Sequence, residues 1–95
     1  MDRNAFIEKL KAKLDELDNE VDKFQIKADQ AGEKVRHEWE NRKLELKEKR
    51  TELQSRLDQL RNDSNAQWEE LKTHAEKTWD SARNSMKDIR DSLFK

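Results

Sequence analysis

Two glutamate–histidine pairs are the residues of this chain best suited, by type and spacing, to bind a metal ion. His37 follows Glu33 by four positions, and His74 follows Glu70 by four. Residues four apart share one face of an α-helix, so each pair could offer two zinc ligands while a second helix supplied the others. Di-metal bundles use a Glu-x-x-His spacing instead, with the ligands inside the apolar stripe. Because both histidines have polar neighbours, we predict solvated surface pairs, no metal site and no cofactor.

A basic run at residues 42–50 is the second candidate site, since it could contact phosphate. It is interleaved with Glu45 and Glu48 and has no aromatic residue after Trp39 on which a base could stack, which favours a solvated helix face over a nucleic-acid surface. The chain also lacks a glycine-rich phosphate loop and any arrangement of nucleophile, base and orienting group. The sequence therefore predicts a protein that is not an enzyme and has no small-molecule substrate. The basic residues of the run are Arg42, Lys43, Lys47, Lys49 and Arg50.

The composition favours long helices packed through a narrow apolar seam. Of the 95 residues, 32% are hydrophobic and 45% are charged, with no proline and one glycine. So few apolar residues cannot fill a wide core, but they suffice for a seam that uses two positions in seven. The net charge of −1 argues against binding nucleic acid or an anionic membrane through bulk charge. Because the sequence contains no signal-like segment and no long apolar run, we expect one helical domain over residues 1–95 and a cytoplasmic location.

The predicted seam combines two periodicities. Residues 7–35 form a heptad with steps of three and four, which predicts a left-handed, coiled-coil-like seam that continues through Ala28 and Ala31. From Phe24 onward, apolar residues recur every eleven positions, a spacing typical of straighter helices. The seam, or partner face, is predicted to comprise Ile7, Leu10, Leu14, Leu17, Val21, Phe24, Val35, Trp39, Leu46, Leu53, Leu57, Leu60, Trp68, Leu71, Ala75, Trp79, Ala82, Met86, Ile89 and Leu93.

Two candidate breaks divide the chain into three helices of similar size, about 2–30, 33–61 and 65–94. The first is Gly32, the only glycine, and the second is Arg-Asn-Asp-Ser-Asn at 61–65. Ser64 and Gln67 fit a capping box that would start the third helix. Residues 1–33 carry nine acids and six bases, while 34–61 carry nine bases and six acids, which favours antiparallel packing. The stripe keeps its phase through both breaks, so one or two long continuous helices in an oligomeric coiled coil remain an alternative.

One stretch resembles a known kind of protein. Ala66-Gln67-Trp68-Glu69-Glu70-Leu71-Lys72, followed by Ala75-Glu76-Lys77-Thr78-Trp79, is similar to the repeated Ala-x-Trp…Trp signature of small uncharacterised bacterial coiled-coil proteins. That resemblance implies a helical hairpin or bundle and no known activity. The eleven-residue period is also similar, more loosely, to late-embryogenesis-abundant stress proteins and exchangeable apolipoproteins.

These observations predict an all-α, coiled-coil-like antiparallel bundle, with three helices as the leading arrangement. The predicted function is a non-enzymatic structural or protein-interaction module, whose helical seam serves homo-oligomerisation or docking of a partner helix. The alternative is a stress-protective or membrane-surface amphipathic protein, in which Trp39, Trp68 and Trp79 would lie at the lipid interface. The heptad in the first third favours bundle packing for these tryptophans.

Overall fold

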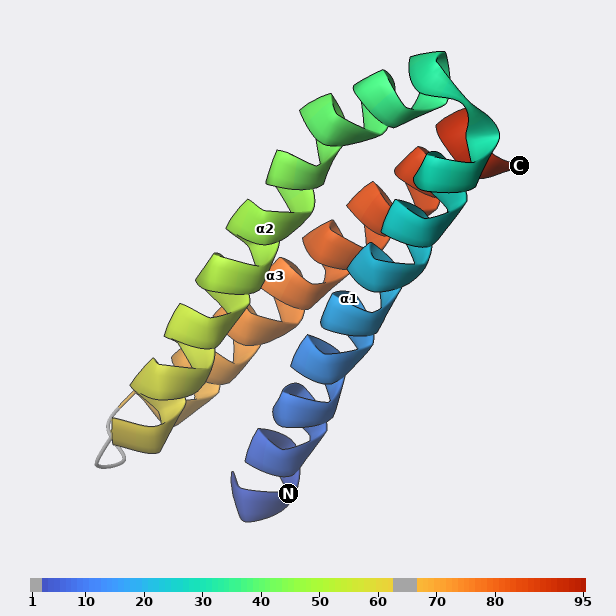
Figure 1. The fold of residues 1–95 in the computed structure, drawn as a ribbon. Coiled ribbons are helices and arrows are strands. Elements are labelled where there is room, and N and C mark those ends of the chain that lie inside the picture. Colours follow the sequence, from blue (N-terminus) through green and yellow to red (C-terminus); the bar gives the residue numbers. More distant parts are fainter. Residues whose placement is uncertain (1–2, 63–66) are drawn as a thin grey trace.

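The chain folds as a bundle of helices. The computed structural model describes residues 3–62 and 67–95, and these contain three α-helices, α1 (Arg3–Ala31), α2 (Glu33–Asn62) and α3 (Trp68–Ile89), followed by a π-helical turn, η1 (Arg90–Phe94). No strand occurs in these ranges. The bundle measures 50 × 18 × 17 Å (Figure 1). The predicted all-α class and the leading three-helix arrangement are confirmed.

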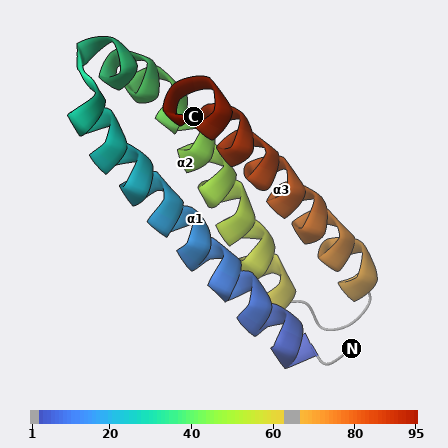
Figure 2. The same ribbon diagram turned by 90° about the vertical axis from the view of Figure 1, so that its right-hand side faces the viewer.

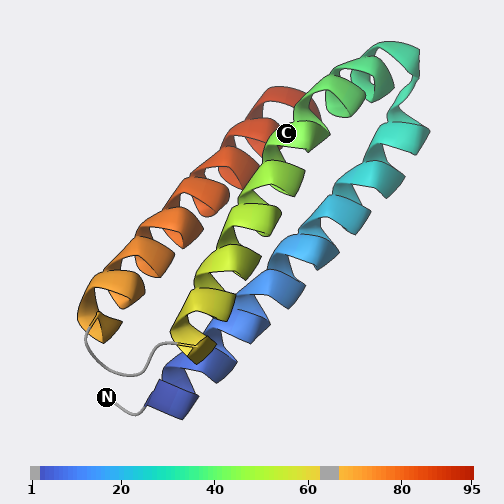
Figure 3. The same ribbon diagram turned by 90° about the vertical axis from the view of Figure 1, so that its left-hand side faces the viewer.

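The three helices lie side by side with their long axes nearly aligned (Figures 2 and 3). α2 runs antiparallel to both of its neighbours and packs along its length against each, so α1 and α3 run in the same direction. η1 brings the C-terminal end beside the α1–α2 turn, where the rings of Phe94 and Phe24 stack with centroids 5.2 Å apart. The predicted attraction between an acidic α1 and a basic α2 is represented by one ion pair, Asp18 with Arg50, at 2.9 Å.

Gly32 is the whole connection between α1 and α2. Its φ of +109° is a backbone conformation that residues with a Cβ rarely adopt. Its carbonyl oxygen accepts the first hydrogen bond of α2, from the Arg36 N–H at 3.1 Å, so one residue both ends α1 and begins α2. Glu33 then lies in the first turn of α2, where the helix dipole favours an acid. The continuous helix considered as an alternative is therefore broken at this glycine.

The second break lies partly outside the described residues. α2 ends at Asn62, close to the prediction, but α3 begins at Trp68 rather than at 65. Gln67 has a non-helical backbone (φ −121°, ψ 14°), accepts a hydrogen bond from the Leu71 N–H at 2.9 Å, and makes no side-chain capping bond. Its expected role inside the first turn of a capping box is therefore wrong. Ser64, the other residue of that box, falls outside the described ranges. The α-helix also ends earlier than the predicted 94, because Arg90–Phe94 form the π-helical turn.

The core is one continuous apolar cluster along the bundle axis. Side chains from all three α-helices contribute, and Leu17, Trp39 and Leu46 are fully buried. The heptad differs from its prediction at the hinge, because Ala31 is exposed and Val35 only partly buried. The chain reverses at Gly32, so neither residue has a helix opposite it. The buried hydrophobic residues are Phe6, Leu10, Leu14, Leu17, Phe24, Ala28, Trp39, Leu46, Leu53, Leu57, Leu60, Trp68, Ala75, Trp79, Ala82, Met86 and Ile89.

Candidate interaction surface

The two glutamate–histidine pairs considered as candidate metal ligands do not come together. His37 is exposed on α2, and His74 is partly buried on α3, in a shallow recess beside Lys49, Glu52 and Lys77. Among residues 3–62 and 67–95, no group of three or more histidine, cysteine, aspartate or glutamate side chains is placed to hold a metal ion. Each pair supplies at most two ligands from its own helix, whereas zinc requires three or four.

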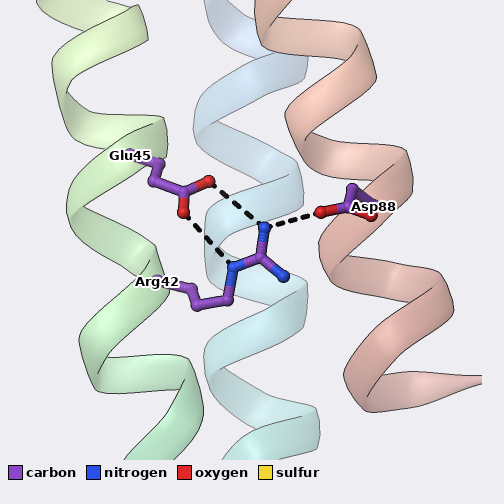
Figure 4. A network of polar contacts seen from close by, with 3 residues as sticks. All are labelled: Arg42, Glu45 and Asp88. Atoms are coloured by element: carbon purple, nitrogen blue, oxygen red, sulfur yellow. Dashed lines mark hydrogen bonds and ion pairs between the residues drawn. The ribbon is translucent and has the colours of Figure 1, made fainter.

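Several side chains of the basic run form ion pairs that hold the helices together. The Arg42 guanidinium bridges two helices, because it contacts Glu45 at 3.3 Å on its own helix and Asp88 of α3 at 2.7 Å (Figure 4). The hydrogen bond from Arg42 to Asp88 raises the pKa of Arg42, and the bond to Glu45 adds to this effect. Lys43 lies 2.9 Å from Glu40 and lowers the pKa of that carboxyl. Three of the five bases of the run, Arg42, Lys43 and Arg50, are thus in ion pairs within the bundle.

Trp39 anchors the end of the bundle near the α1–α2 turn. Its side chain is 0% exposed, and its indole N–H donates to Oε1 of Gln25 on α1 at 2.9 Å. The indole also meets the Phe24 ring edge to face, with centroids 5.6 Å apart. The buried indole therefore has both a polar partner and an aromatic one, as its mixed chemistry requires. In this structure Trp39 lies in the bundle core.

The other two tryptophans lie where α1 meets α3, and cations of α1 cover them. The Arg3 guanidinium sits 4.7 Å from the centre of the Trp68 ring, and Lys13 Nζ sits 4.5 Å from that of Trp79. In the reverse direction, Lys72 of α3 approaches the Phe6 ring at 5.6 Å. Such contacts are worth about 0.5–1 kcal/mol each at exposed sites. Cations over aromatic faces thus join α1 to α3, and no ion pair joins these two helices among the described residues.

A groove runs along this side of the bundle, because α1 and α3 make few direct contacts with each other. We call it the α1–α3 groove. Its first recess, about 200 Å³, has a floor of Phe6, Leu10, Ala75 and Trp79. A second recess, about 360 Å³, lies farther along the same two helices. The remaining residues lining the first recess are Lys9, Lys13, Glu76, Asp80 and Arg83, and the second is lined by Glu16, Glu20, Phe24, Arg83, Met86, Lys87 and Arg90.

The charges along the α1–α3 groove reverse halfway. In the first recess the bases Lys9 and Lys13 of α1 face the acids Glu76 and Asp80 of α3. In the second recess α1 instead supplies acids, and α3 with η1 supplies bases: Glu16 and Glu20 face Arg83 and Lys87 of α3 and Arg90 of η1. A shift of α3 along α1 would bring like charges together. The pattern therefore favours the observed parallel register, and it gives the groove walls of both signs over an apolar floor.

The structure places nearly all of the predicted seam inside the bundle. Four of its members, Ile7, Val21, Leu71 and Leu93, are partly buried and pack against the core, whereas Val35 is partly buried at the turn. The rest of the predicted seam is buried. Sequence reasoning missed Phe6, which is buried, and Phe94, which is partly buried; each lies one position beside a predicted member and packs with it against the core. It also missed the charged walls of the α1–α3 groove, whose signal is the change from bases to acids within α1 and from acids to bases within α3.

Comparisons with protein-family models, with curated proteins and with solved structures find no match for this chain. The resemblance to small bacterial coiled-coil proteins therefore stays a prediction. Within the described ranges, no helix has the length and apolar character needed to cross a membrane.

Proposed function

We propose that this chain is a non-enzymatic structural or protein-interaction module, which associates with a second copy or with a partner helix through its helical surfaces. The α1–α3 groove is the observation that carries the proposal. α2 has a helix packed on each side, but α1 and α3 leave a recess between them, whose charged walls stand over the almost fully buried Phe6, Leu10 and Trp79. A partner helix can lie along such a groove.

The charges of the groove add specificity to this proposal. The first recess presents Lys9 and Arg83 as well as Glu76 and Asp80, all exposed. A docking helix needs both acids and bases along its flanks to match these walls, and such a mixture is abundant in this chain itself. Exposed charge pairs contribute little affinity individually, but a mismatched register brings like charges together and is disfavoured.

A membrane-surface role, the alternative predicted from the sequence, would require the bundle to open. The apolar faces of all three helices point into one shared core, so lipid would have to compete with that packing. Circular dichroism in dilute buffer separates the two functions. The bundle proposal expects high helicity and a cooperative melt without lipid. A spectrum that is largely unfolded and becomes helical only with anionic vesicles would contradict it.

Site-specific crosslinking tests the groove as a contact surface. The chain has no cysteine, so single Asp80→Cys and Glu48→Cys variants each carry one benzophenone label, the first in the groove and the second on the exposed surface of α2. Mixing with unlabelled, isotopically heavy chain identifies products that join two molecules. We expect inter-chain products from position 80 and few from position 48. A chain that sediments as a monomer at millimolar concentration and gives no inter-chain product from position 80 would refute self-association through this groove.

A further inference from the structure

We propose that two copies of this chain exchange their α1 helices, with α1 and α2 of each copy joined through Gly32 into one continuous helix. This inference rests on the self-association in the proposed function and gives it a second route, in which the copies associate by exchanging α1 and not by filling the α1–α3 groove. Each copy of the exchanged dimer would supply α1 to the α2 and α3 of the other. Four observations around the turn carry the argument.

The first observation is that the hinge is a single residue. α1 ends at Ala31 and α2 begins at Glu33, so only the backbone of Gly32 keeps the two helices antiparallel. Returning this one residue from φ +109° to helical angles would make residues 3–62 one helix. An added Cβ at Gly32 would find no atom within 4 Å, so the neighbours do not oppose a side chain, and the backbone angle alone does. Short hinges of this kind favour exchange between copies.

The second observation is that the sequence does not interrupt its apolar pattern at the turn. The heptad passes from Ala28 through Ala31 to Val35 in steps of three and four. A hairpin needs no apolar residues at its bend, and here it leaves Ala31 exposed and Val35 partly buried. A continuous helix would place both residues on the same stripe as the buried Ala28 and Trp39. In a straight helix all of these apolar residues would lie on one continuous stripe, whereas the hairpin buries only some of them.

The third observation is the register of α1 against α2. Asp18 of α1 pairs with Arg50 of α2, and Gln25 of α1 pairs with Lys43 of α2. In both pairs, the position halfway between the two residues along the sequence is residue 34. If α1 comes from the other copy, the same pairing sets two long helices antiparallel with their twofold axis close to that residue. Ala31 of one copy then lies near Val35 of the other, because the midpoint of this pair is residue 33. The exchange would cover the two residues that the hairpin leaves open.

The fourth observation is that exchange loses no native contact away from the hinge. The Trp39–Gln25 hydrogen bond and the Phe6–Trp68 ring contact each join α1 to a different helix. Both form equally well when α1 belongs to another copy. The monomer and the exchanged dimer therefore differ mainly in the conformation of Gly32, in the contacts of Ala31 and Val35, and in the entropy of association.

The test is Gly32→Ala, with Gln30→Ala as its control. Alanine at position 32 destabilises the hairpin, which needs positive φ there, but is favoured inside a continuous helix. Each exchanged dimer contains two such positions, so its formation would relieve the strain at both. The strain relieved at each hinge corresponds to a factor of about ten in the association equilibrium. With two hinges, the dimer dissociation constant measured by sedimentation equilibrium should fall roughly a hundredfold. Gln30 is exposed one residue before the end of α1, and its change to alanine also raises helix propensity while leaving the hinge glycine in place. We expect the control to associate as the wild type does.

A distance measurement shows whether a dimer is exchanged. Exposed positions 12 and 55 have their midpoint between residues 33 and 34, so they lie at the same level of the bundle. Spin labels at Ala12→Cys and Ser55→Cys in one chain should be close in the hairpin and about 65 Å apart along a continuous helix. Diluting labelled Gly32→Ala with unlabelled chain removes the distances between copies, and the remaining distance should be the long one.

Three outcomes would overturn the proposal. They are a Gly32→Ala chain that stays monomeric, one that unfolds without dimerising, and a dimer in which the diluted sample keeps the short distance. In the last case the chain still self-associates, so the proposed interaction function survives while helix exchange fails. If neither wild type nor variant associates at any concentration, the self-association part of the proposed function fails as well.

Discussion

Replacing Trp39 should remove a large part of the stability of this bundle. The side chain is 0% exposed, and a buried tryptophan removes about 150–250 Å² from water. At about 25 cal/mol per Å² this area corresponds to roughly 4–6 kcal/mol, an upper bound because unfolded chains already bury some surface. Alanine retains the Cβ, so we expect Trp39→Ala to lower the free energy of unfolding by about 3–5 kcal/mol. A chain of 95 residues has about 5–14 kcal/mol in total.

Two milder variants divide this loss between packing and hydrogen bonding. Trp39→Phe keeps an aromatic ring against Phe24 but loses the N–H that donates to Gln25, and should cost about 1–2 kcal/mol. Gln25→Ala removes the acceptor instead and should cost about 1 kcal/mol, because it leaves the buried indole N–H unpaired. The measurement is urea unfolding followed by far-ultraviolet circular dichroism. A loss below about 1 kcal/mol for Trp39→Ala would refute the closely packed position described here.

Two further predictions concern the core and the acid dependence of stability. Leu46→Ala on α2 should cost about 2–5 kcal/mol, whereas Leu44→Ala two residues earlier should change stability by less than about 0.5 kcal/mol, because Leu46 is 0% exposed and Leu44 is 58% exposed. Thermal melts of the two variants check this, and equal losses would contradict the assigned helix face. The pKa of Glu40 lies below its ordinary value of 4.5, mainly because the carboxylate accepts a hydrogen bond from Lys43. The ionised Glu40 therefore stabilises the folded state above pH 4.5, and this stabilisation disappears as the pH falls through the lower pKa of the folded state. The difference in Tm between wild type and Glu40→Gln should therefore be largest near neutral pH and shrink in acid, and a difference that does not change with pH would count against this ion pair.

The residues at the two ends of α3 show where sequence patterns lose accuracy. The helix begins at Trp68 instead of 65, and the Gln67 side chain makes no capping hydrogen bond to the described part of this helix. A capping box is a local signal, but Trp68 also packs against Phe6 at the far end of the chain, with ring centroids 5.9 Å apart. At the other end, the π-helical turn places Phe94 on Phe24, a contact between residues seventy positions apart. Packing between helices determined both ends, and no short window of sequence contains that information.

The sequence by itself determined that this chain is helical, which face of each helix is apolar, and that Gly32 is a point of weakness. These properties follow from the spacing of apolar residues and from the backbone preferences of single residues, both of which can be read from short segments of the sequence. Only the tertiary structure decided that Gly32 turns the chain back, with φ +109°, and that Ala31 is exposed and Val35 only partly buried there. It also brought bases of α1 opposite acids of α3 to form the α1–α3 groove. The physical reason is that the apolar stripe of a helix determines which face must be buried, but not which other helix buries it. The packing partner is determined by contacts between residues that are far apart in the sequence.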